Sequence, residues 1–308
     1  MNIVAAVVAV LITFVAHFDS FMHIANNTPA SETTDMLTAY FYSVFAEEMD
    51  GNLGLGMIFG MLCGLPWLFL IRGKRFVTSD IPRVNSKAKF GVLLVLLLCI
   101  FGIQGFMYLI QIFLEPLFNQ GGGSLTDVLE ESTTSLAVTF WGALYIVLIG
   151  PVCEELLFRG GVMRHLERYG ANFAIVLSSL LFALYHMILF QAAFAFFIGL
   201  VLAYTAGRFS LKWAIVLHMI NNGLAILPLL VNSELLSMVL TWVYLGSFVA
   251  VVIILIWVLS FGRHLLTGQK KAGAPSEPRV FSRAFSSPWL IAYIAATGLV
   301  AFSLLGFF

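Results

Sequence analysis

Long apolar runs alternate with short polar segments along most of this chain. Because lipid offers no hydrogen-bond partner to an open backbone, each run is predicted to be a helix. Apolar runs near the ~20 residues that cross the hydrocarbon core of a bilayer predict an all-α, polytopic membrane helix bundle of about eight or nine transmembrane helices. The predicted spans are residues 2–18, 53–71, 90–114, 134–153, 171–190, 191–207, 211–231, 236–261 and 289–308.

The distribution of basic residues predicts how the chain is oriented in the membrane. With nine spans and a cytoplasmic N-terminus, all 16 Lys and Arg residues fall on the cytoplasmic side. The opposite segments, 19–52, 115–133 and 232–235, contain acidic residues but no Lys or Arg. Short loops enriched in Lys and Arg stay cytoplasmic, so this asymmetry supports the topology. The first run is interpreted as a retained span, and segment 19–52 as an outer connection with a short amphipathic piece.

Composition narrows the class of protein further. Of the 308 residues, 60% are hydrophobic and 10% are charged, whereas about 25% of a soluble domain is charged. So few charges cannot cover a water-facing surface, which excludes a soluble globular enzyme. The formal net charge is zero, so electrostatics give no reason to expect a nucleic-acid partner, and the expected surrounding is the lipid bilayer. Cys63, Cys99 and Cys153 all fall in apolar runs and are interpreted as small hydrophobic residues.

Two adjacent carboxylates, Glu154 and Glu155, follow the fourth apolar run without a break. Residues four apart share a helix face, so Glu155 is predicted to pair with Arg159. Glu154 is rotated by about 100° from Glu155 on a helix and is left to face another partner. The alternative interpretation is an ordinary solvated ion pair at a cytoplasmic helix end.

The fifth and seventh spans add imidazole and amide groups at one-turn spacing. Phe182 and His186 share a face of the fifth span, and His218 and Asn222 share a face of the seventh. A hairpin between the fourth and fifth spans brings the glutamates and His186 level to within about one turn. For the glutamates and His186 to lie at the same depth in the membrane, segment 154–170 has to be helical and to protrude into the cytoplasm, and we predict that it does. A hydrogen-bonded packing role is the alternative for each histidine, but the whole set predicts one polar cavity.

These groups have the chemistry of a hydrolase. A carboxylate beside an imidazole, shielded from bulk water, can activate a water molecule as a general base. A second histidine with an asparagine one turn away supplies donors for a developing oxyanion, worth about 3–4 kcal/mol apiece. Together they predict acyl hydrolysis without a covalent intermediate. Zinc held by Glu154, His186 and His218 is the rival use, but the chain has no HExxH helix and no cofactor is expected.

The three polar segments resemble the motifs of the CPBP family of intramembrane proteases. This family comprises the CAAX prenyl endopeptidases of the Ras-converting type, the bacterial Abi proteins and the bacteriocin-processing or immunity proteins. The resemblance rests on three motifs in the same order, namely Glu154-Glu155-x-x-x-Arg159, Phe182-x-x-x-His186 and His218-x-x-x-Asn222.

The resemblance implies an intramembrane endopeptidase of glutamate-dependent or metal-dependent type. Glu154 would activate the hydrolytic water with assistance from His186, and His218 and Asn222 would form the oxyanion site. The supporting residues would be Glu155, Arg159 and Phe182. The substrate would be a membrane peptide or a lipid-modified protein, and the site would open to the cytoplasmic side.

The resemblance covers one part of the chain and leaves two other functions open. The first alternative is a non-catalytic membrane immunity or regulatory protein. The second is a proton-coupled transporter, since intramembrane Glu and His can relay protons. The predicted parts of the chain are N-terminal transmembrane helices with no recognised motif (1–130), a CAAX-protease-like catalytic bundle (131–261), a cytoplasmic linker (262–288) and a last transmembrane helix (289–308).

Overall fold

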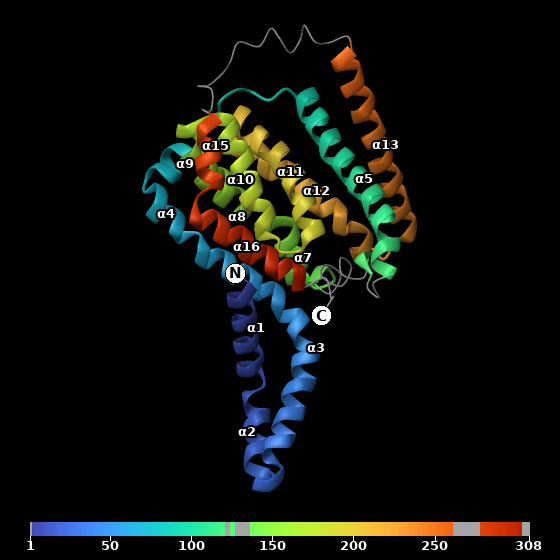
Figure 1. Ribbon diagram of the computed structural model, residues 1–308. Helices are drawn as coiled ribbons and strands as arrows, with labels where there is room; N and C mark the ends of the chain where they lie inside the picture. The colour runs from blue at the N-terminus through green and yellow to red at the C-terminus, as the bar shows by residue number, and fades with distance from the viewer. Residues whose placement is uncertain (1, 121–123, 127–135, 261–277, 304–308) are drawn as a thin grey trace.

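The computed structural model describes residues 2–120, 124–126, 136–260 and 278–303 as an all-α protein (Figure 1). Within these residues the extended backbone amounts to one isolated bridge, between Val84 and Ser210. The α-helices are α1 (Asn2–Ala16), α2 (Phe18–Asn27), α3 (Ala30–Gly64), α4 (Pro66–Arg72), α5 (Phe90–Gln120), α7 (Phe140–Leu144), α8 (Gly150–Glu155), α9 (Arg164–Leu166), α10 (Ala171–Tyr185), α11 (Leu189–Arg208), α12 (Leu211–Leu230), α13 (Glu234–Ser260), α15 (Pro278–Phe285) and α16 (Pro288–Ser303). Wider π-helical turns form η1 (Phe76–Asp80), η2 (Tyr145–Ile149) and η3 (Leu156–Met163), and η4 (Glu167–Tyr169) is a 3₁₀ turn.

Among the described residues, six helices are long and apolar enough to cross a membrane. Two shorter apolar helices, Ala171–Tyr185 and Pro288–Val300, match two further predicted spans, and the first predicted span is helical as α1. The predicted all-α polytopic bundle is therefore confirmed, and the chain is an integral membrane protein. The six long helices are Leu53–Leu70, Phe90–Gln120, Phe140–Tyr169, Leu189–Arg208, Leu211–Leu230 and Glu234–Ser260.

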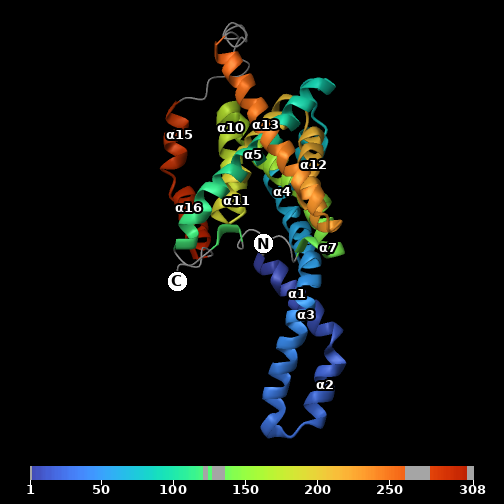
Figure 2. The same cartoon turned by 90° about the vertical axis from the view of Figure 1, so that its right-hand side faces the viewer.

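α1, α2 and the N-terminal half of α3 form a helical hairpin that projects from one end of the bundle (Figure 1, Figure 2). Aromatic side chains join its two arms. The ring centroids of Phe21 and Tyr40 are 5.2 Å apart, and His17 Nδ1 lies 3.1 Å from the Tyr40 hydroxyl oxygen. α2 and α3 occupy most of segment 19–52, so the predicted connection is helical over more of its length than one short piece.

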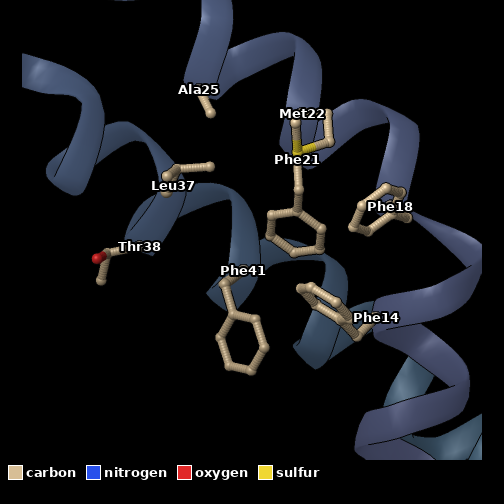
Figure 3. Close-up of a pocket in the computed structure, with 8 residues that line it drawn as sticks. All are labelled: Phe14, Phe18, Phe21, Met22, Ala25, Leu37, Thr38 and Phe41. Atoms are coloured by element: carbon tan, nitrogen blue, oxygen red, sulfur yellow. The ribbon is translucent and has the colours of Figure 1, made fainter. Parts of the chain in front are cut away.

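α2 is the short amphipathic piece expected in that segment. Its polar residues, such as Asp19 and Asn26, are exposed. Its apolar residues face α3 across a pocket (Figure 3), and this packing explains why a segment with many polar residues is helical. The pocket is lined by Phe14, Phe18, Phe21, Met22, Ala25, Leu37, Thr38 and Phe41.

The basic segments of the chain meet at one end of the bundle. Arg83 Nη1 pairs with Glu167 Oε2 at 2.7 Å, and the Ser86 hydroxyl donates to the Arg208 carbonyl at 2.7 Å. These contacts join the segment before α5 to the 3₁₀ turn η4 and to the end of α11. Basic residues that lie far apart in sequence therefore share one end, as the charge pattern predicts. The side of the membrane on which this end lies stays a prediction.

Small residues pack closely between α10, α11 and α12. Ala174 of α10, Ala203 of α11 and Ala214 of α12 are fully buried in one apolar cluster. The hairpin into α10 turns at Gly170, whose φ of 116° is a left-handed conformation that favours glycine. The predicted hairpin between the fourth and fifth spans is confirmed.

Candidate active site

The two glutamates lie midway along a continuous helix from Phe140 to Tyr169. The helix continues past the end of the fourth apolar run at Cys153, so the prediction that the segment after Glu154 is helical is confirmed. Glu154 lies about 22 Å from either end of this helix at a rise of 1.5 Å per residue. The π-helical turns η2 and η3 flank α8, and such turns change which face the following side chains occupy and are frequent at functional sites.

Glu155 and Arg159 form a fully buried ion pair, as their spacing predicts. Arg159 Nη1 donates to Glu155 Oε1 at 2.8 Å, and both side chains have no exposed surface. Arg159 Nη2 donates to the Gly199 carbonyl of α11 at 3.1 Å. The alternative of a solvated pair at a helix end is therefore wrong, because both charges lie inside the bundle.

His218 of α12 contacts both glutamates. Its Nδ1 lies 3.1 Å from Glu155 Oε1, and its Nε2 lies 3.7 Å from Glu154 Oε2. A carboxylate can only accept, so Nδ1 carries the hydrogen of the first contact. The second distance is too long for a direct hydrogen bond. His218 is thus held by Glu155 and leaves Nε2 next to the carboxylate of Glu154.

Glu154 is buried, with 8% of its surface exposed. It also interacts electrostatically with His186 of the neighbouring helix. No direct hydrogen bond to the Glu154 carboxylate is found within the described part of the chain, in contrast to Glu155. The free carboxylate that the sequence predicts at this position therefore lies between two imidazoles.

His186 ends α10 rather than lying inside it, so the predicted span 171–190 extends too far. Its Nδ1 donates to the Phe182 carbonyl at 2.9 Å, and its backbone N–H donates to Ala183 at 3.0 Å. Met187 then has a φ of 60°, which stops the helix before α11 begins. The side chain of His186 thus caps the helix end. In the neutral ring, Nε2 remains as a hydrogen-bond acceptor.

The ring of Phe182 brings these groups together. Its centroid is 4.8 Å from that of His186 and 5.8 Å from that of His218, and both contacts are edge-to-face. The Arg159 guanidinium lies 4.3 Å from the same centroid. Phe182 therefore contacts both imidazoles and the guanidinium of the ion pair, a larger role than its one-turn spacing to His186 indicates.

Asn222 forms hydrogen bonds that the sequence does not predict. Its Nδ2 donates to the backbone carbonyl of Ile146 at 3.0 Å, and its Oδ1 accepts from Asn221 Nδ2 at 3.1 Å. Asn221 Oδ1 in turn accepts from Gln104 Nε2 of α5 at 3.0 Å. Among the described residues, the hydrogen bonds of Asn222 go to Ile146 and Asn221 and not to His218 or the glutamates, so its predicted oxyanion role rests on its place one turn after His218.

Two tyrosines that sequence reasoning missed lie beside Glu154. The hydroxyls of Tyr145 and Tyr185 form a hydrogen bond with each other, and both residues interact electrostatically with Glu154. The Tyr185 ring centroid is 5.9 Å from that of His186. The position of Tyr185 directly before His186 in the sequence could have indicated that it lies near the site. The sequence gives no such signal for Tyr145, because this residue begins the π-helical turn η2, which changes the faces that side chains occupy relative to an α-helix.

Each histidine of the cluster has one ring nitrogen, Nε2, left for a further partner. Nδ1 of His186 and Nδ1 of His218 are both engaged in hydrogen bonds with the protein. In the part of the chain that the structure describes, no group of three or more His, Cys, Asp or Glu side chains is arranged to hold a metal ion. The three cysteines are free thiols, and the metal requirement stays a prediction.

A family model agrees with this cluster of residues. The model described as type II CAAX prenyl endopeptidase Rce1-like matches residues 136–224, which contain all seven predicted site residues. The match confirms the resemblance to the CPBP family that the three motifs predict, and it supports a CAAX-type intramembrane protease in general. No curated protein and no solved structure matches the chain.

Proposed function

We propose that this chain, whose residues 136–224 match the Rce1-like CAAX prenyl endopeptidase family, is an intramembrane endopeptidase that hydrolyses a peptide bond in a membrane-associated or lipid-modified substrate. The observation that carries the proposal is the buried contact of His218 with Glu155 at 3.1 Å and with Glu154 at 3.7 Å. A carboxylate and imidazoles gathered away from bulk water are the groups that general-base hydrolysis requires.

Glu154 is the general base of the proposed reaction. Its carboxylate accepts a proton from a water molecule, whose oxygen attacks the carbonyl carbon of the peptide bond. His186 assists through Nε2, because its Nδ1 is bonded to the Phe182 carbonyl. The C–N bond then breaks, and the proton held by Glu154 passes to the leaving amine. Glu155 is a supporting residue, because Arg159 and His218 hold it through Oε1 and its side chain has no exposed surface.

His218 and Asn222 stabilise the oxyanion of the tetrahedral intermediate. In the doubly protonated form of His218, Nδ1 stays bonded to Glu155 and the Nε2–H donates to the oxyanion. Asn222 uses one amide hydrogen for the Ile146 carbonyl, and an amide nitrogen carries a second. Each such donor is worth about 3–4 kcal/mol in the transition state.

The substrate is held at the membrane and reaches the site from the cytoplasmic side. Glu154 is buried midway along a helix that is long enough to span a bilayer. A peptide with an apolar segment or a lipid anchor reaches that depth more readily than a soluble peptide. The half of the helix that follows Glu154 carries Arg164 and Arg168, and segments rich in basic residues stay cytoplasmic.

Replacement of the proposed base tests the function. Purified protein is incubated with a membrane-peptide library, and cleavage products are identified by mass spectrometry. Glu154→Gln keeps the shape of the side chain and lowers the cleavage rate by about 10²–10⁴-fold, because the general base is lost. Glu234→Gln, at an exposed glutamate at the start of α13, is the matched control and keeps the wild-type rate. Equal cleavage by wild type and Glu154→Gln would end the proposal.

We also propose that the reaction needs no bound metal. The arrangement of the side chains supports this proposal, since among the described residues no three His, Cys, Asp or Glu side chains are placed to hold a metal ion. Cleavage by protein dialysed against a chelator should therefore match that of untreated protein, and elemental analysis should find zinc well below one ion per chain. Loss of cleavage on chelation with recovery on adding Zn²⁺ would contradict it.

A further inference from the structure

Pro151 lies in the continuous helix Phe140–Tyr169, which carries Glu154 and Glu155 and is called the glutamate helix below. This proline leaves one backbone carbonyl of the helix without a backbone donor. In the wider turn η2, the Gly150 N–H donates to the Tyr145 carbonyl five residues earlier. The same pattern would pair the Ile146 carbonyl with residue 151, but that residue is proline and has no N–H. A carbonyl left unpaired inside a protein costs about 1–3 kcal/mol.

The side chain of Asn222 supplies the missing donor, at 3.0 Å from the Ile146 oxygen. Because a carbonyl can only accept, this contact fixes which end of each amide is nitrogen in the chain behind it. Asn222 Oδ1 accepts from Asn221, and Asn221 Oδ1 accepts from Gln104. Three amides thus form one directed chain of hydrogen bonds from α5 through α12 to η2.

This chain attaches α12 to the glutamate helix at a second point. The first point is the contact of His218 with Glu155, and the second is the contact of Asn222 with Ile146. His218 and Asn222 lie one helical turn apart on the same face of α12. Two attachments on one face fix how far α12 can slide or rotate against the helix that carries Glu154.

We propose that Gln104, Asn221 and Pro151 are positioning residues, which act through Asn222 and the Ile146 carbonyl to hold α12 in the register that sets His218 beside Glu154. Gln104 lies on a different helix from the glutamates and the histidines, so it acts only through the amide chain. The effect on catalysis rests on the proposed endopeptidase function, whereas the effect on helix docking does not.

A double-mutant cycle measured by thermal unfolding in detergent tests the docking. Asn222→Ala removes the donor to Ile146 and lowers Tm by about 3–6 °C. Pro151→Ala restores a backbone N–H, so that either residue 151 or, in a tighter α-helical turn, Gly150 donates to that carbonyl. In the Pro151→Ala background, Asn222→Ala should therefore lower Tm by less than half as much. An equal loss in both backgrounds would overturn the proposal.

A kinetic comparison of two glutamines on α5 tests the effect on catalysis. Gln104→Leu breaks the amide chain and lowers kcat by about 10–100-fold with KM within about twofold, because the reacting groups are misplaced. Gln111→Leu is the matched control, since Gln111 donates to Thr126 outside the chain, and it keeps the wild-type kcat. If Gln104→Leu does not fold, Gln104→Met replaces it, because an unbranched side chain of similar length has no N–H or O–H to donate to Asn221.

The outcomes separate this proposal from the proposed function. A wild-type kcat in the Gln104 variant would overturn the positioning role. Absence of peptide cleavage by the wild type would end the endopeptidase proposal, and the Tm cycle of Asn222 and Pro151 would then decide the docking role without it.

Discussion

Arg159 is the residue around which the candidate site is organised. Its guanidinium bonds Glu155 within its own helix and the Gly199 carbonyl on α11, and it lies over the ring of Phe182 on α10. A methyl group at Gly199 would lie 3.2 Å from both Arg159 Nη2 and the Phe182 ring. Such a group would crowd both side chains, which explains glycine at that position. One buried cation therefore links three helices and holds the glutamate that binds His218.

Replacement of Phe182 should separate catalysis from stability. Phe182→Leu removes the ring edge that both imidazoles contact, and we expect kcat to fall about tenfold or more because their positions relax. Phe173→Leu is the matched control, because Phe173 is equally buried on α10 but contacts Tyr169 and Phe281 instead of the site. Each variant should lose about 1–3 kcal/mol of unfolding free energy. Equal kcat values for the two variants would show that Phe182 only fills space.

Spacing on an α-helix predicts those site contacts that lie within one helical turn. The pairing of Glu155 with Arg159 follows from the four-residue spacing and needs no knowledge of the fold. The contact of Asn222 with Ile146 could not be predicted in this way, because it depends on a π-helical turn. Pro151 was the one local signal, since a proline inside an apolar helix frees a carbonyl four or five residues earlier.

At the scale of elements, the apolar pattern predicts that helices form better than it predicts where they end. α10 ends at Tyr185 because the His186 side chain takes the Phe182 carbonyl and Met187 adopts a left-handed φ. Both features interrupt a run that stays apolar throughout. Segment 19–52 is helical over more of its length than its polar residues indicate: Asp19 and Asn26 of α2 are exposed, whereas apolar residues of α2 and α3 line one pocket.

α5 and α13 pack closely because of a glycine. A methyl group at Gly105 would overlap the backbone carbonyl of Tyr244 on α13, whereas one at Gly91 would meet nothing. Close approach at small residues is a common way for membrane helices to associate. We therefore expect Gly105→Ala to cost about 1–3 kcal/mol through overpacking. Gly91→Ala, on the same helix, should leave Tm unchanged or raise it slightly through helix propensity.

Thermal unfolding of the two alanine variants in the same detergent measures this difference. The comparison removes the common effect of replacing glycine by alanine in a helix and leaves the contact with α13. Similar Tm values for Gly105→Ala and Gly91→Ala would contradict the prediction, because they would mean that α5 and α13 can move apart without loss of stability.

For the whole molecule, the side of the membrane on which the basic end lies and the side on which the N-terminus lies are separate questions. The basic segments share one end through the contacts of Arg83 and Ser86. The N-terminal hairpin projects from the end opposite α9 and α15 (Figure 1). The N-terminus lies near the base of the hairpin in the same view. A cytoplasmic N-terminus and a cytoplasmic basic end are therefore two predictions, which have to be tested with separate labels.

Labelling of single cysteines in intact cells tests the orientation of the bundle. In a background without Cys63, Cys99 and Cys153, we place a cysteine at Lys87 or at Glu234, which are exposed before α5 and at the start of α13. Because basic segments stay cytoplasmic, a membrane-impermeant maleimide should label Glu234→Cys in intact cells and Lys87→Cys only after permeabilisation. The reverse pattern would place the basic end outside, and the proposed site would then open away from the cytoplasm.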